Sequence, residues 1–307
     1  MKNKSLKAGG AKASILRLSD RAAYNLLIAP FLILFFLFTI LPVLSSVVLS
    51  FFSYDTISFP QFNGIQNYLR MFTGDEVFPI AFQNTLKLAL ITGPAGFLLS
   101  FVLAWFINEF SPAMRTVLSF LFYAPALSGN AYFVWSIAFS GDAYGYINNF
   151  LLTYGLITEP IAWFNNTSYN FPIMVMILLW SGMGASFLAN IAGLQNVNPE
   201  LYEAGAIDGI RTRWHELWYI TLPSMKTILL FSAVMQIQSS FSVGGVITAL
   251  AGYPTVSNSL DTLVPHLSDV AMTRFEMGYA SAMSVVLFGM MALTRIVIGK
   301  VLNFLGK

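Results

Sequence analysis

Apolar residues in this chain gather in long runs that are separated by polar stretches. The first run, from Ala22 to Tyr54, contains no charged residue. Five further runs follow it, and each reaches or approaches the roughly 20 residues with which an α-helix crosses a bilayer. The pattern therefore predicts six membrane-spanning helices, over about residues 22–54, 84–108, 116–139, 171–194, 226–250 and 278–298.

Several of these runs contain residues that bend or break helices. Pro42 is expected to kink the first run, and Gly93-Pro94 to interrupt the second. Such breaks are tolerated inside a membrane bundle, because neighbouring helices satisfy the carbonyl groups that proline leaves unbonded. In the fourth run, Gly182 and Gly184 are expected to let helices pack closely against one another.

One polar stretch, Asn198 to Pro223, is predicted to form structure of its own outside the membrane. Asn198 before Pro199 indicates a helix start, because an asparagine side chain can accept from free N–H groups of the first turn and proline has no N–H to lose there. Gly209, which follows Asp208, predicts the end of that helix, since glycine readily takes the left-handed conformation.

A second short helix is predicted in the same stretch. Thr212 is expected to cap it and Pro223 to end it. Trp214 and Trp218 lie four residues apart, so they would stack on one helix face. The polar stretch is therefore expected to be two short helices joined by a sharp glycine corner.

The composition places the chain outside the soluble globular class. Of its 307 residues, 56% are hydrophobic and 10% are charged, and the mean hydropathy is +0.69; soluble domains carry about a quarter charged residues. The net charge of +2 does not indicate nucleic-acid binding, and the absence of cysteine excludes disulfides, thiolate metal sites and cysteine nucleophiles. The histidines, His215 and His266, are far apart in the sequence, and neither is expected to bind a metal.

Basic residues are unequally divided between the two sides that six spans define. The side with both termini and the polar stretch holds 13 of the 16 lysines and arginines. They are Lys2, Lys4, Lys7, Lys12, Arg17, Arg21, Arg115, Arg211, Arg213, Lys226, Arg295, Lys300 and Lys307. Since cytoplasmic loops carry the excess of basic residues, this side is predicted to be cytoplasmic. Residues 1–24 then form a basic cytoplasmic tail, and residues 25–307 form one transmembrane domain.

The sequence shows no grouping of residues typical of an enzyme. The phosphate-binding pattern G-x-x-x-x-G-K-[ST] does not occur, so an ATP-driven activity would need an ATPase on another chain. The acidic residues lie in loops or at the ends of spans, whereas an ion-coupled transporter needs ionisable groups at membrane depth. This placement disfavours an ion-coupled secondary transporter, which stays the alternative interpretation. A non-transport scaffold is a third.

The polar stretch also carries a family resemblance. Glu203-Ala204-Gly205, Gly209 and Ile220-x-Leu222-Pro223 resemble the EAA loop of permease subunits of binding-protein-dependent ABC importers, in which alanine usually stands at the position of Gly205. The preceding Gly193-Leu194-Gln195 resembles the carbohydrate-uptake branch, which includes maltose and glycerol-phosphate systems. Weaker similarity to that branch is found in four segments, 62–68, 84–86, 145–148 and 278–282.

This resemblance implies an all-α polytopic membrane helix bundle with the type I ABC importer permease fold. It implies a bacterial cytoplasmic-membrane protein, multi-pass with both termini cytoplasmic, that translocates a sugar or oligosaccharide. The implied partners are a second homologous permease, two cytoplasmic ATPase subunits and an extracytoplasmic sugar-binding protein. ATP and Mg would be bound by the ATPase subunits, and no cofactor is expected in this chain.

The first short helix of the polar stretch is expected to be a coupling helix that docks into a groove on the ATPase. The candidate coupling residues are Glu203, Ala204, Gly205, Asp208 and Gly209. The small Ala204 and Gly205 would permit close approach, and Glu203 would offer a charged hydrogen-bonding anchor. The alternative is a surface helix without a partner. Three neighbours are expected to pack the stretch against the bundle instead: Leu201, Tyr202 and Ile207.

Polar residues along the fifth run are candidates for contact with the substrate. Ser232, Gln236 and Ser240 recur at every fourth position and so share one helix face, with Ser239 beside them. Neutral amides and hydroxyls suit a sugar, whose hydroxyls both donate and accept hydrogen bonds. The alternative is ordinary hydrogen bonding between helices. Gln238 and Ser242 lie off this face, and the remaining pathway candidates come from the fourth and third runs, Asn190 and Asn130.

Overall fold

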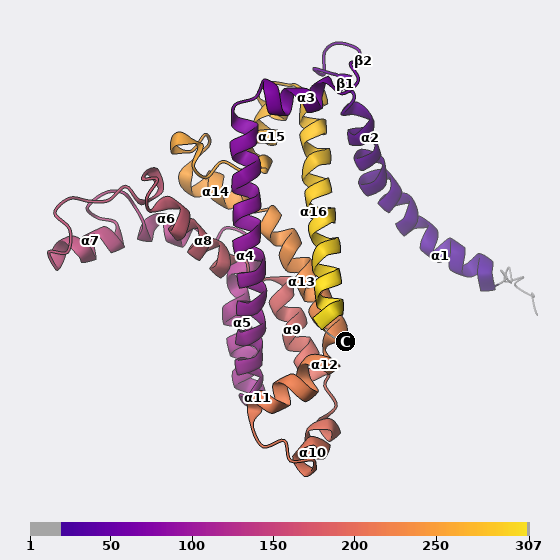
Figure 1. The fold of residues 1–307 in the computed structure, drawn as a ribbon, viewed down its shortest axis with the longest axis vertical. Helices are drawn as coiled ribbons and strands as arrows, with labels where there is room; N and C mark the ends of the chain where they lie inside the picture. Colours follow the sequence, from indigo (N-terminus) through magenta and orange to yellow (C-terminus); the bar gives the residue numbers. More distant parts are fainter. Residues whose placement is uncertain (1–19, 306–307) are drawn as a thin grey trace, which may run out of the picture. The chain divides into compact units, whose positions relative to one another are not determined.

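The computed structural model describes residues 20–305 and divides into two compact units (Figure 1). The first unit ends at Val48 and the second begins at Leu49. The helical segments of the first apolar run are α1 (Asp20–Phe35), the π-helix η1 (Phe36–Ile40) and α2 (Leu41–Leu49). Residues 1–19 of the predicted basic tail lie outside the described residues.

The first apolar run forms one helical stretch, of which Asn25–Leu49 is long and apolar enough to cross a membrane. The disturbance predicted at Pro42 takes the form of the π-helical turn just before it. There the N–H of Leu41 bonds to the carbonyl of Phe36. Because a proline ring crowds the preceding turn and has no N–H, the wider π turn accommodates the Leu41-Pro42 pair.

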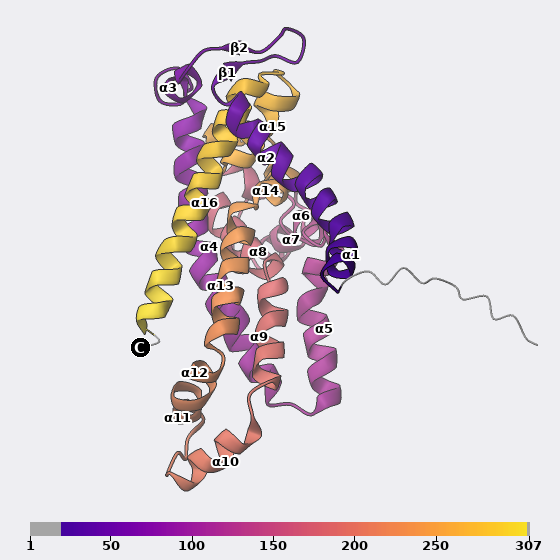
Figure 2. The same ribbon diagram turned by 90° about the vertical axis from the view of Figure 1, so that its right-hand side faces the viewer.

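The second unit is a helix bundle whose long members run side by side (Figures 1 and 2). Three helices pack against one another in its centre: α4 (Val77–Asn108), α9 (Ala185–Gln195) and α13 (Lys226–Phe241). Two more lie against this group, α5 (Pro112–Ser128) on α4 and α9, and α16 (Met277–Leu305) on α13. The largest hydrophobic cluster, which includes Phe101 and Phe187, fills the space between α4 and α9.

Short elements close both ends of this bundle. One end, which we call the cap, contains β1 (Phe52–Ser53), β2 (Gln61–Phe62), α3 (Gln66–Thr73), the 3-10 helix η4 (Val256–Asn258) and α15 (Leu263–Met272). The two strands pair antiparallel, Phe52 opposite Phe62. The opposite end carries the elbow, residues 198–223, with α10 (Pro199–Ile207), α11 (Arg213–Glu216), the π-helix η3 (Leu217–Thr221) and the start of α12 (Leu222–Ser224). Figure 2 shows that α16 ends toward the elbow.

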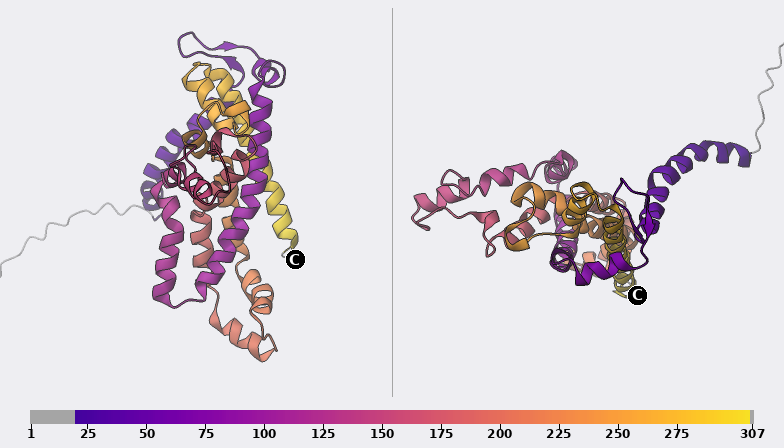
Figure 3. Two further views of the ribbon diagram at one scale, coloured as in Figure 1. Left: turned by 90° about the vertical axis from the view of Figure 1, so that its left-hand side faces the viewer. Right: turned by 90° about the horizontal axis from the view of Figure 1, so that it is seen from above.

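A lateral arm, residues 131–169, leaves the bundle and returns to it. Its elements are α6 (Phe133–Ala138), α7 (Tyr146–Thr153) and the 3-10 helix η2 (Trp163–Asn165). The chain returns through α8 (Asn170–Ser181), and α14 (Gly244–Ala251) packs against α6 and η2. Figure 3 shows the arm projecting away from the long helices when the molecule is seen from above.

The predicted number of six spans is not confirmed. Among residues 20–305, four helical segments are long and apolar enough to cross a membrane, and a fifth crossing arises if α8 and α9, bent by 45°, count as one. The third predicted span is divided, because α5 ends at Ser128 and Gly129 takes a left-handed φ of 67°. The fourth is bent at Gly182–Gly184, where a Cβ on Gly182 would lie 2.8 Å from the carbonyl oxygen of Leu178. Both glycines also face neighbouring helices, since a Cβ on Gly182 would lie 3.6 Å from Nε2 of Gln236 on α13 and one on Gly184 would lie 3.6 Å from Cβ of Ala126 on α5.

The second predicted span starts earlier than expected and is not interrupted. The side chain of Asp75 accepts from the N–H groups of Val77 (2.9 Å) and Phe78 (3.0 Å), which caps α4 before the predicted start at Asn84. The interruption predicted at Gly93-Pro94 is wrong, since α4 continues to Asn108. Packing against α13 on this face, where Gly93 lies beside Ser240, outweighs the local cost of the proline.

Three buried asparagines fasten the connecting segments, and they lie in three of the family-like segments of the sequence. The Nδ2 group of Asn67 donates to the carbonyls of Ser50 and Phe52 in the cap. Asn84 donates likewise to the carbonyls of Asn258 and Asp261. In the arm, Nδ2 of Asn148 lies 3.0 Å from each of three carbonyl oxygens, those of Ser140, Asp142 and Ile161. An amide with two N–H donors can satisfy two buried carbonyls at once, so each of these positions favours asparagine over an apolar residue.

We predict that Gly96→Val destabilises the second unit. A Cβ at this position would lie 2.3 Å from Nε2 and 3.0 Å from Cδ of Gln236, so α4 and α13 would have to separate or Gln236 would have to move. Overpacking of this kind costs about 1–3 kcal/mol, which is expected to lower the thermal unfolding temperature in detergent. The control is Gly289→Val on α16, where a Cβ meets nothing within 4 Å. Equal unfolding temperatures for the two variants would contradict the packing argument.

Candidate functional site

The elbow begins as the sequence predicts. Asn198 precedes α10, and its Oδ1 accepts from the N–H of Glu200 at 3.1 Å. The helix ends at Ile207, and Gly209 takes a φ of 92°, which forms the predicted corner. Thr212 caps the second helix by accepting from the N–H of His215 at 3.3 Å. These three local predictions are confirmed.

The second half of the elbow differs from the prediction in two respects. Pro223 does not end the helix, because a π turn before the Leu222-Pro223 pair carries the helical path on to Ser224, as at Leu41-Pro42. Trp214 contacts Trp105 of α4, with ring centroids 5.5 Å apart and ring planes tilted by 50°, and Trp214 and Trp218 are each 64% exposed. The stacking partner of Trp214 is therefore on the bundle, and the contact joins the elbow to the end of α4.

Polar contacts join the elbow to the bundle at the same place. Arg213 forms ion pairs with Glu109, which follows α4, and with Glu216 of its own helix, both at 2.7 Å. Within the elbow, the hydroxyls of Tyr202 on α10 and Thr221 on η3 lie 2.9 Å apart. A polar hollow of about 320 Å³ lies between these elements, and it is lined by Trp105, Asn108, Glu109, Leu194, Tyr202, Arg213, Glu216 and Thr221.

The candidate coupling residues divide into one buried and four exposed positions. Gly205 is buried, and a Cβ there would lie 2.7 Å from Cδ1 of Ile220 and 3.2 Å from Cδ1 of Ile210. Gly205 therefore faces side chains of its own elbow. The other four candidates are exposed: Glu203, Ala204, Asp208 and Gly209.

Two of the three residues expected to pack against the bundle do not do so. Ile207 is 88% exposed and Leu201 is 45% exposed, whereas Tyr202 is half-buried and bonded as described. Turning α10 so that Gly205 faces Ile220 directs Ile207 outward, because the two positions lie on different faces of the helix. The exposed surface of α10 therefore combines a carboxylate, Glu203, with large apolar side chains.

The serine and glutamine face of α13 points into the bundle. Ser232, Gln236 and Ser240 share one face as predicted, and all three are at most 3% exposed. Ser186 of α9 places its hydroxyl 2.9 Å from Ser232 and 2.9 Å from Ser100 of α4, so three helices are joined by hydroxyl contacts. For Ser232 the alternative interpretation, hydrogen bonding between helices, therefore holds.

The other buried candidates have fewer polar partners. Gln236 lies over Gly96, with Nε2 3.5 Å from the carbonyl of Thr92, while Ser240 donates to the carbonyl of Ile237 at 2.8 Å. Asn190 is fully buried, and neither its Oδ1 nor its Nδ2 has a hydrogen-bond partner within the described part of the chain. A buried amide without partners is costly, which distinguishes Asn190 from the satisfied asparagines of the loops.

The accessible polar face of α13 is the neighbouring one. Ser239 lies there, together with Gln238 and Ser242, which the sequence had placed off the candidate face. Two open hollows of about 230 and 190 Å³ meet at Ser239, Ser242 and Gly182. The larger of the two is also lined by Gln238, by the predicted Gln236 and by Ser186 of α9. The bend between α8 and α9 and the end of α5 form their other walls, and Asn130 is exposed beside them, its Oδ1 accepting from the hydroxyl of Tyr132 at 3.1 Å. No local sequence pattern predicts this face, because the hollows form only where the chain bends between α8 and α9.

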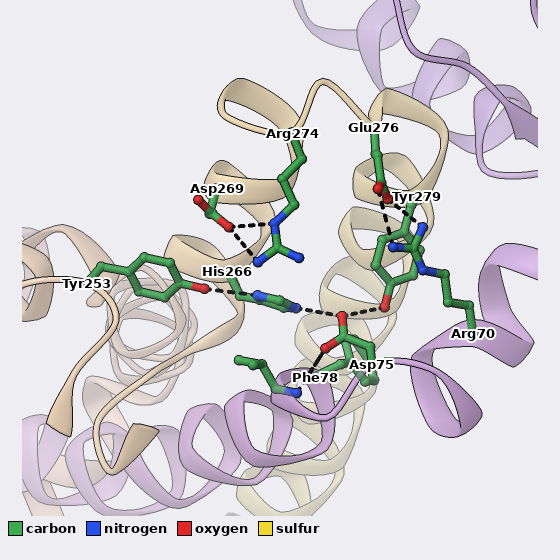
Figure 4. Close-up of polar contacts among 10 residues, drawn as sticks. Arg70, Asp75, Phe78, Tyr253, His266, Asp269, Arg274, Glu276 and Tyr279 are labelled. Atoms are coloured by element: carbon green, nitrogen blue, oxygen red, sulfur yellow. Dashed lines mark hydrogen bonds and ion pairs between the residues drawn. The ribbon is translucent and has the colours of Figure 1, made fainter. Parts of the chain in front are cut away.

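A charged network in the cap was not predicted (Figure 4). The Asp75 carboxylate accepts from the hydroxyl of Tyr279 at 2.7 Å and from Nε2 of the fully buried His266 at 2.8 Å. Nδ1 of His266 lies 2.9 Å from the hydroxyl of Tyr253. Arg70 lies over the Tyr279 ring at 4.4 Å from its centroid and pairs with Glu276. The network joins the start of α4, the loop before α15, α15 and α16.

Protonation in this network follows from its hydrogen bonds. Burial by itself raises the pKa of Asp75, but hydrogen bonds from His266, Tyr279 and the N–H of Phe78 outweigh burial and hold the pKa well below its usual range. Burial raises the pKa of Tyr253 to about 12, so its hydroxyl remains a donor at neutral pH. A charged Asp75 with four donors, Val77, Phe78, His266 and Tyr279, is a structural anchor for the cap.

Comparison with known proteins gives a consistent result. No protein-family model matches the chain. Over 95% of its length the chain is 31% identical to a probable ABC transporter permease protein, YesP of Bacillus subtilis (strain 168), and the match covers 94% of that protein. It is 32% identical to the sulfoquinovosyl glycerol transport system permease protein SmoG of Agrobacterium fabrum, over 90% of this chain and 88% of that protein.

Solved structures share the fold. The chain matches a crystal structure of a bacterial ABC transporter involved in the import of the acidic polysaccharide alginate with a TM-score of 0.76 at 23% identity, covering 94% of this chain and 97% of that one. A second structure, of that type of transporter in complex with an alginate pentasaccharide-bound periplasmic protein, matches with a TM-score of 0.75 at 22% identity, over 94% of this chain and 96% of that one.

We predict a pH-dependent loss of stability for Asp75→Asn. The folded-state pKa of Asp75 lies below its ordinary value of about 4, so the charged form stabilises the fold above that pH, and this contribution declines as the pH falls below about 4. At pH 7 the variant is expected to be less stable by about 2 kcal/mol, the cost of weakening charged hydrogen bonds. The difference from the wild type should shrink as the pH is lowered below about 4, measured by thermal unfolding in detergent. Glu159→Gln in the arm is the control, and a pH-independent difference would contradict the assignment.

Proposed function

This chain belongs to the permease subunits of carbohydrate ABC transporters, and from that premise we propose that it forms one half of the membrane channel of a bacterial importer for a sugar or oligosaccharide. Family membership favours ATP-driven import over an ion-coupled secondary transporter. The proposed site of action is the cytoplasmic membrane, with the elbow and both termini on the cytoplasmic side, in agreement with the distribution of basic residues.

The observation that carries the coupling proposal is the exposed surface of α10 on an elbow that is firmly attached to the bundle. Glu203 and Ile207 are exposed on α10, and the chain itself has no phosphate-binding motif for ATP. We infer two cytoplasmic ATPase subunits as partners, one of which binds this surface. A charged side chain beside an exposed apolar one provides both an oriented contact and buried area in such an interface.

Attachment of the elbow supplies a path for movement. The ion pair of Arg213 with Glu109 and the contact of Trp214 with Trp105 link the elbow to the end of α4. Since α4 packs on α9 and α13, a displacement of α10 is transmitted to the helices that surround the two hollows. In this proposal ATP binding by the partner draws the elbow, and the bundle opens toward the substrate side.

The proposed substrate surface is the part of α13 that lines the hollows, which includes the mostly buried Gln236 as well as exposed residues. Ser239, Gln238 and Ser242 present neutral hydrogen-bonding groups to the hollows, which suits an uncharged sugar. The hollows are open, and we infer that a second, homologous permease closes them. A binding protein outside the membrane would deliver the sugar, by analogy with the alginate transporter, which has been solved in complex with a periplasmic protein.

We predict that Glu203→Lys abolishes sugar uptake while the chain remains in the membrane. Reversal of charge on an exposed position of α10 should disturb the ATPase contact and leave the bundle intact, because Glu203 makes no contact within the core. Uptake, membrane abundance and copurification of the ATPase are to be measured together. Glu159→Lys, far from the elbow in the sequence and equally a carboxylate reversal, should transport normally. Normal uptake by Glu203→Lys would remove α10 from the coupling role.

We predict that Ser239→Phe lowers uptake at least about tenfold without loss of ATPase assembly. A phenylalanine ring fills much of a hollow of about 230 Å³, so it competes directly with a sugar. The matched control is Ser268→Phe, on the exposed face of α15 in the cap. Transport kinetics and copurification of the ATPase provide the measurements, and unchanged kinetics for Ser239→Phe would place the pathway elsewhere.

A further inference from the structure

The polar hollow between the elbow and the bundle is not part of the substrate surface proposed above. On the bundle side it is lined by Trp105 and Asn108 of α4, by Glu109 after α4 and by Leu194 of α9. It shares no lining residue with the two hollows beside Ser239. We call it the elbow hollow, and the groups that line it indicate a ligand of its own.

The hydroxyl groups of the elbow hollow have a defined direction. Thr221 donates to the carbonyl of Glu216 at 3.2 Å, since a carbonyl oxygen can only accept. The single hydroxyl proton of Thr221 is then used, so Tyr202 is the donor in the 2.9 Å contact between the two hydroxyls. Both protons are engaged, and the phenolic oxygen of Tyr202 is left as an acceptor.

The charged groups of the elbow hollow retain both acceptors and donors. Arg213 pairs through Nη2 with Oε2 of Glu109 and through Nη1 with Oε2 of Glu216, each at 2.7 Å. Each carboxylate therefore has a second oxygen, and the guanidinium has further N–H groups, that no described residue binds. A ligand can meet an acid, a base and a phenolic oxygen here at once.

This combination disfavours most classes of ligand. A metal ion or an organic cation would face the positive charge of Arg213, and an anion would face two carboxylates. An apolar compound would leave the polar wall without partners. A neutral polyhydroxy molecule avoids all three costs, because its hydroxyls donate to the carboxylates and to Tyr202 and accept from Arg213. Trp105 and Leu194 provide an apolar wall for the C–H groups of a sugar ring.

The shape of the elbow hollow depends on the position of the elbow. One side is formed by the elbow, through Tyr202, Arg213 and Thr221, and the other by the ends of α4 and α9. A ligand that binds one arrangement of two parts favours that arrangement by the difference in its affinity for the two states. A molecule that bridges the elbow and α4 therefore opposes a displacement of the elbow relative to the bundle.

The volume of the elbow hollow, about 320 Å³, is at the lower end of the roughly 300–1,000 Å³ found for ligand pockets. We propose that the elbow hollow is an effector site for a neutral mono- or disaccharide, and that the bound sugar slows import by holding the elbow against the bundle. This inference rests on the proposed function, because it places the elbow in the cytoplasm, where the imported sugar accumulates. The site would thus sense the product of transport.

Binding is tested on the full chain in lipid nanodiscs by ligand-observed NMR titration. The probes are glucose, galactose, mannose, arabinose, maltose and lactose, with glucosamine and glucuronate as charged counterparts of glucose. At least one neutral sugar should bind, and both charged sugars should bind about tenfold more weakly than the best of them, because each meets a like charge in the hollow.

Variants locate the binding. Glu216→Gln removes a charged acceptor and Tyr202→Phe a neutral one, so the Kd should rise about tenfold and about fivefold respectively. The matched controls are Glu159→Gln in the arm and Tyr219→Phe, a 71% exposed phenol of the elbow that does not line the hollow. Ser239→Phe should leave this binding unchanged, which separates the elbow hollow from the substrate surface.

The effect on the motor is measured as ATP hydrolysis by the importer assembled in nanodiscs with its second permease, ATPase and binding protein. A saturating concentration of the best neutral sugar should slow hydrolysis by about threefold in the wild type and leave Glu216→Gln unaffected. Hydrolysis that sugar slows equally in both would overturn the effector role, as would hydrolysis that sugar does not slow in the wild type.

The failure of this inference is distinguishable from failure of the proposed function. If the importer takes up sugar with ATP but no neutral sugar binds, or if binding is lost in Ser239→Phe and kept in Glu216→Gln, the effector site is refuted and the proposed function stands. Uptake by this chain that an ion gradient drives without an ATPase would instead refute the proposed function.

Discussion

Close packing of α4 against α9 and α13 is the interaction on which the rest of the second unit depends. Gly96 lets the side chain of Gln236 lie against α4, and Gly193 leaves room for Met225 and Ile228, since a Cβ there would meet them within 3 Å. Contact at this distance brings the hydroxyls of Ser100, Ser186 and Ser232 into hydrogen-bond range. Small residues and short polar side chains are the means by which helices associate where there is no water to expel.

The same three helices connect the two ends of the molecule. α4 receives the elbow through Arg213 and Trp214, and α13 presents Ser239 and Ser242 to the hollows. The buried serines make the three helices move as a group, because breaking their contacts would leave hydroxyls unpaired in an apolar environment. In the proposed mechanism, a displacement of α10 would reach the hollows through this packing, without a continuous chain of charged groups.

The peripheral modules follow a different rule. The arm and the cap are each organised around one polar side chain that satisfies several partners at once, the buried Asn148 in the arm and the partly buried Asp75 in the cap. Such residues cost free energy unless every partner is in place, so they specify one loop conformation. Rigid loops suit the proposed docking against other chains, while within the described residues the centre of the bundle keeps unsatisfied amide atoms on both Asn190 and Gln236.

Signals that act within a few residues could be predicted from the sequence alone. The apolar runs, the cap at Asn198, the corner at Gly209 and the EAA-like spacing of the elbow depend on nearest neighbours along the chain, and the helical membrane fold and the family follow from them. Bends in the helices were harder to predict, because whether proline or glycine breaks a helix depends on what packs against it. α4 continues through Gly93-Pro94 beside α13, whereas α8 and α9 bend at Gly182–Gly184. The orientation of α13 could not be predicted either, since both of its faces carry polar residues and only the placement of α4, α9 and α5 decides which face is buried and which lines a hollow. In the cap network, Asp75 contacts Tyr279, which is 204 positions away, and no periodicity within one segment encodes such a contact.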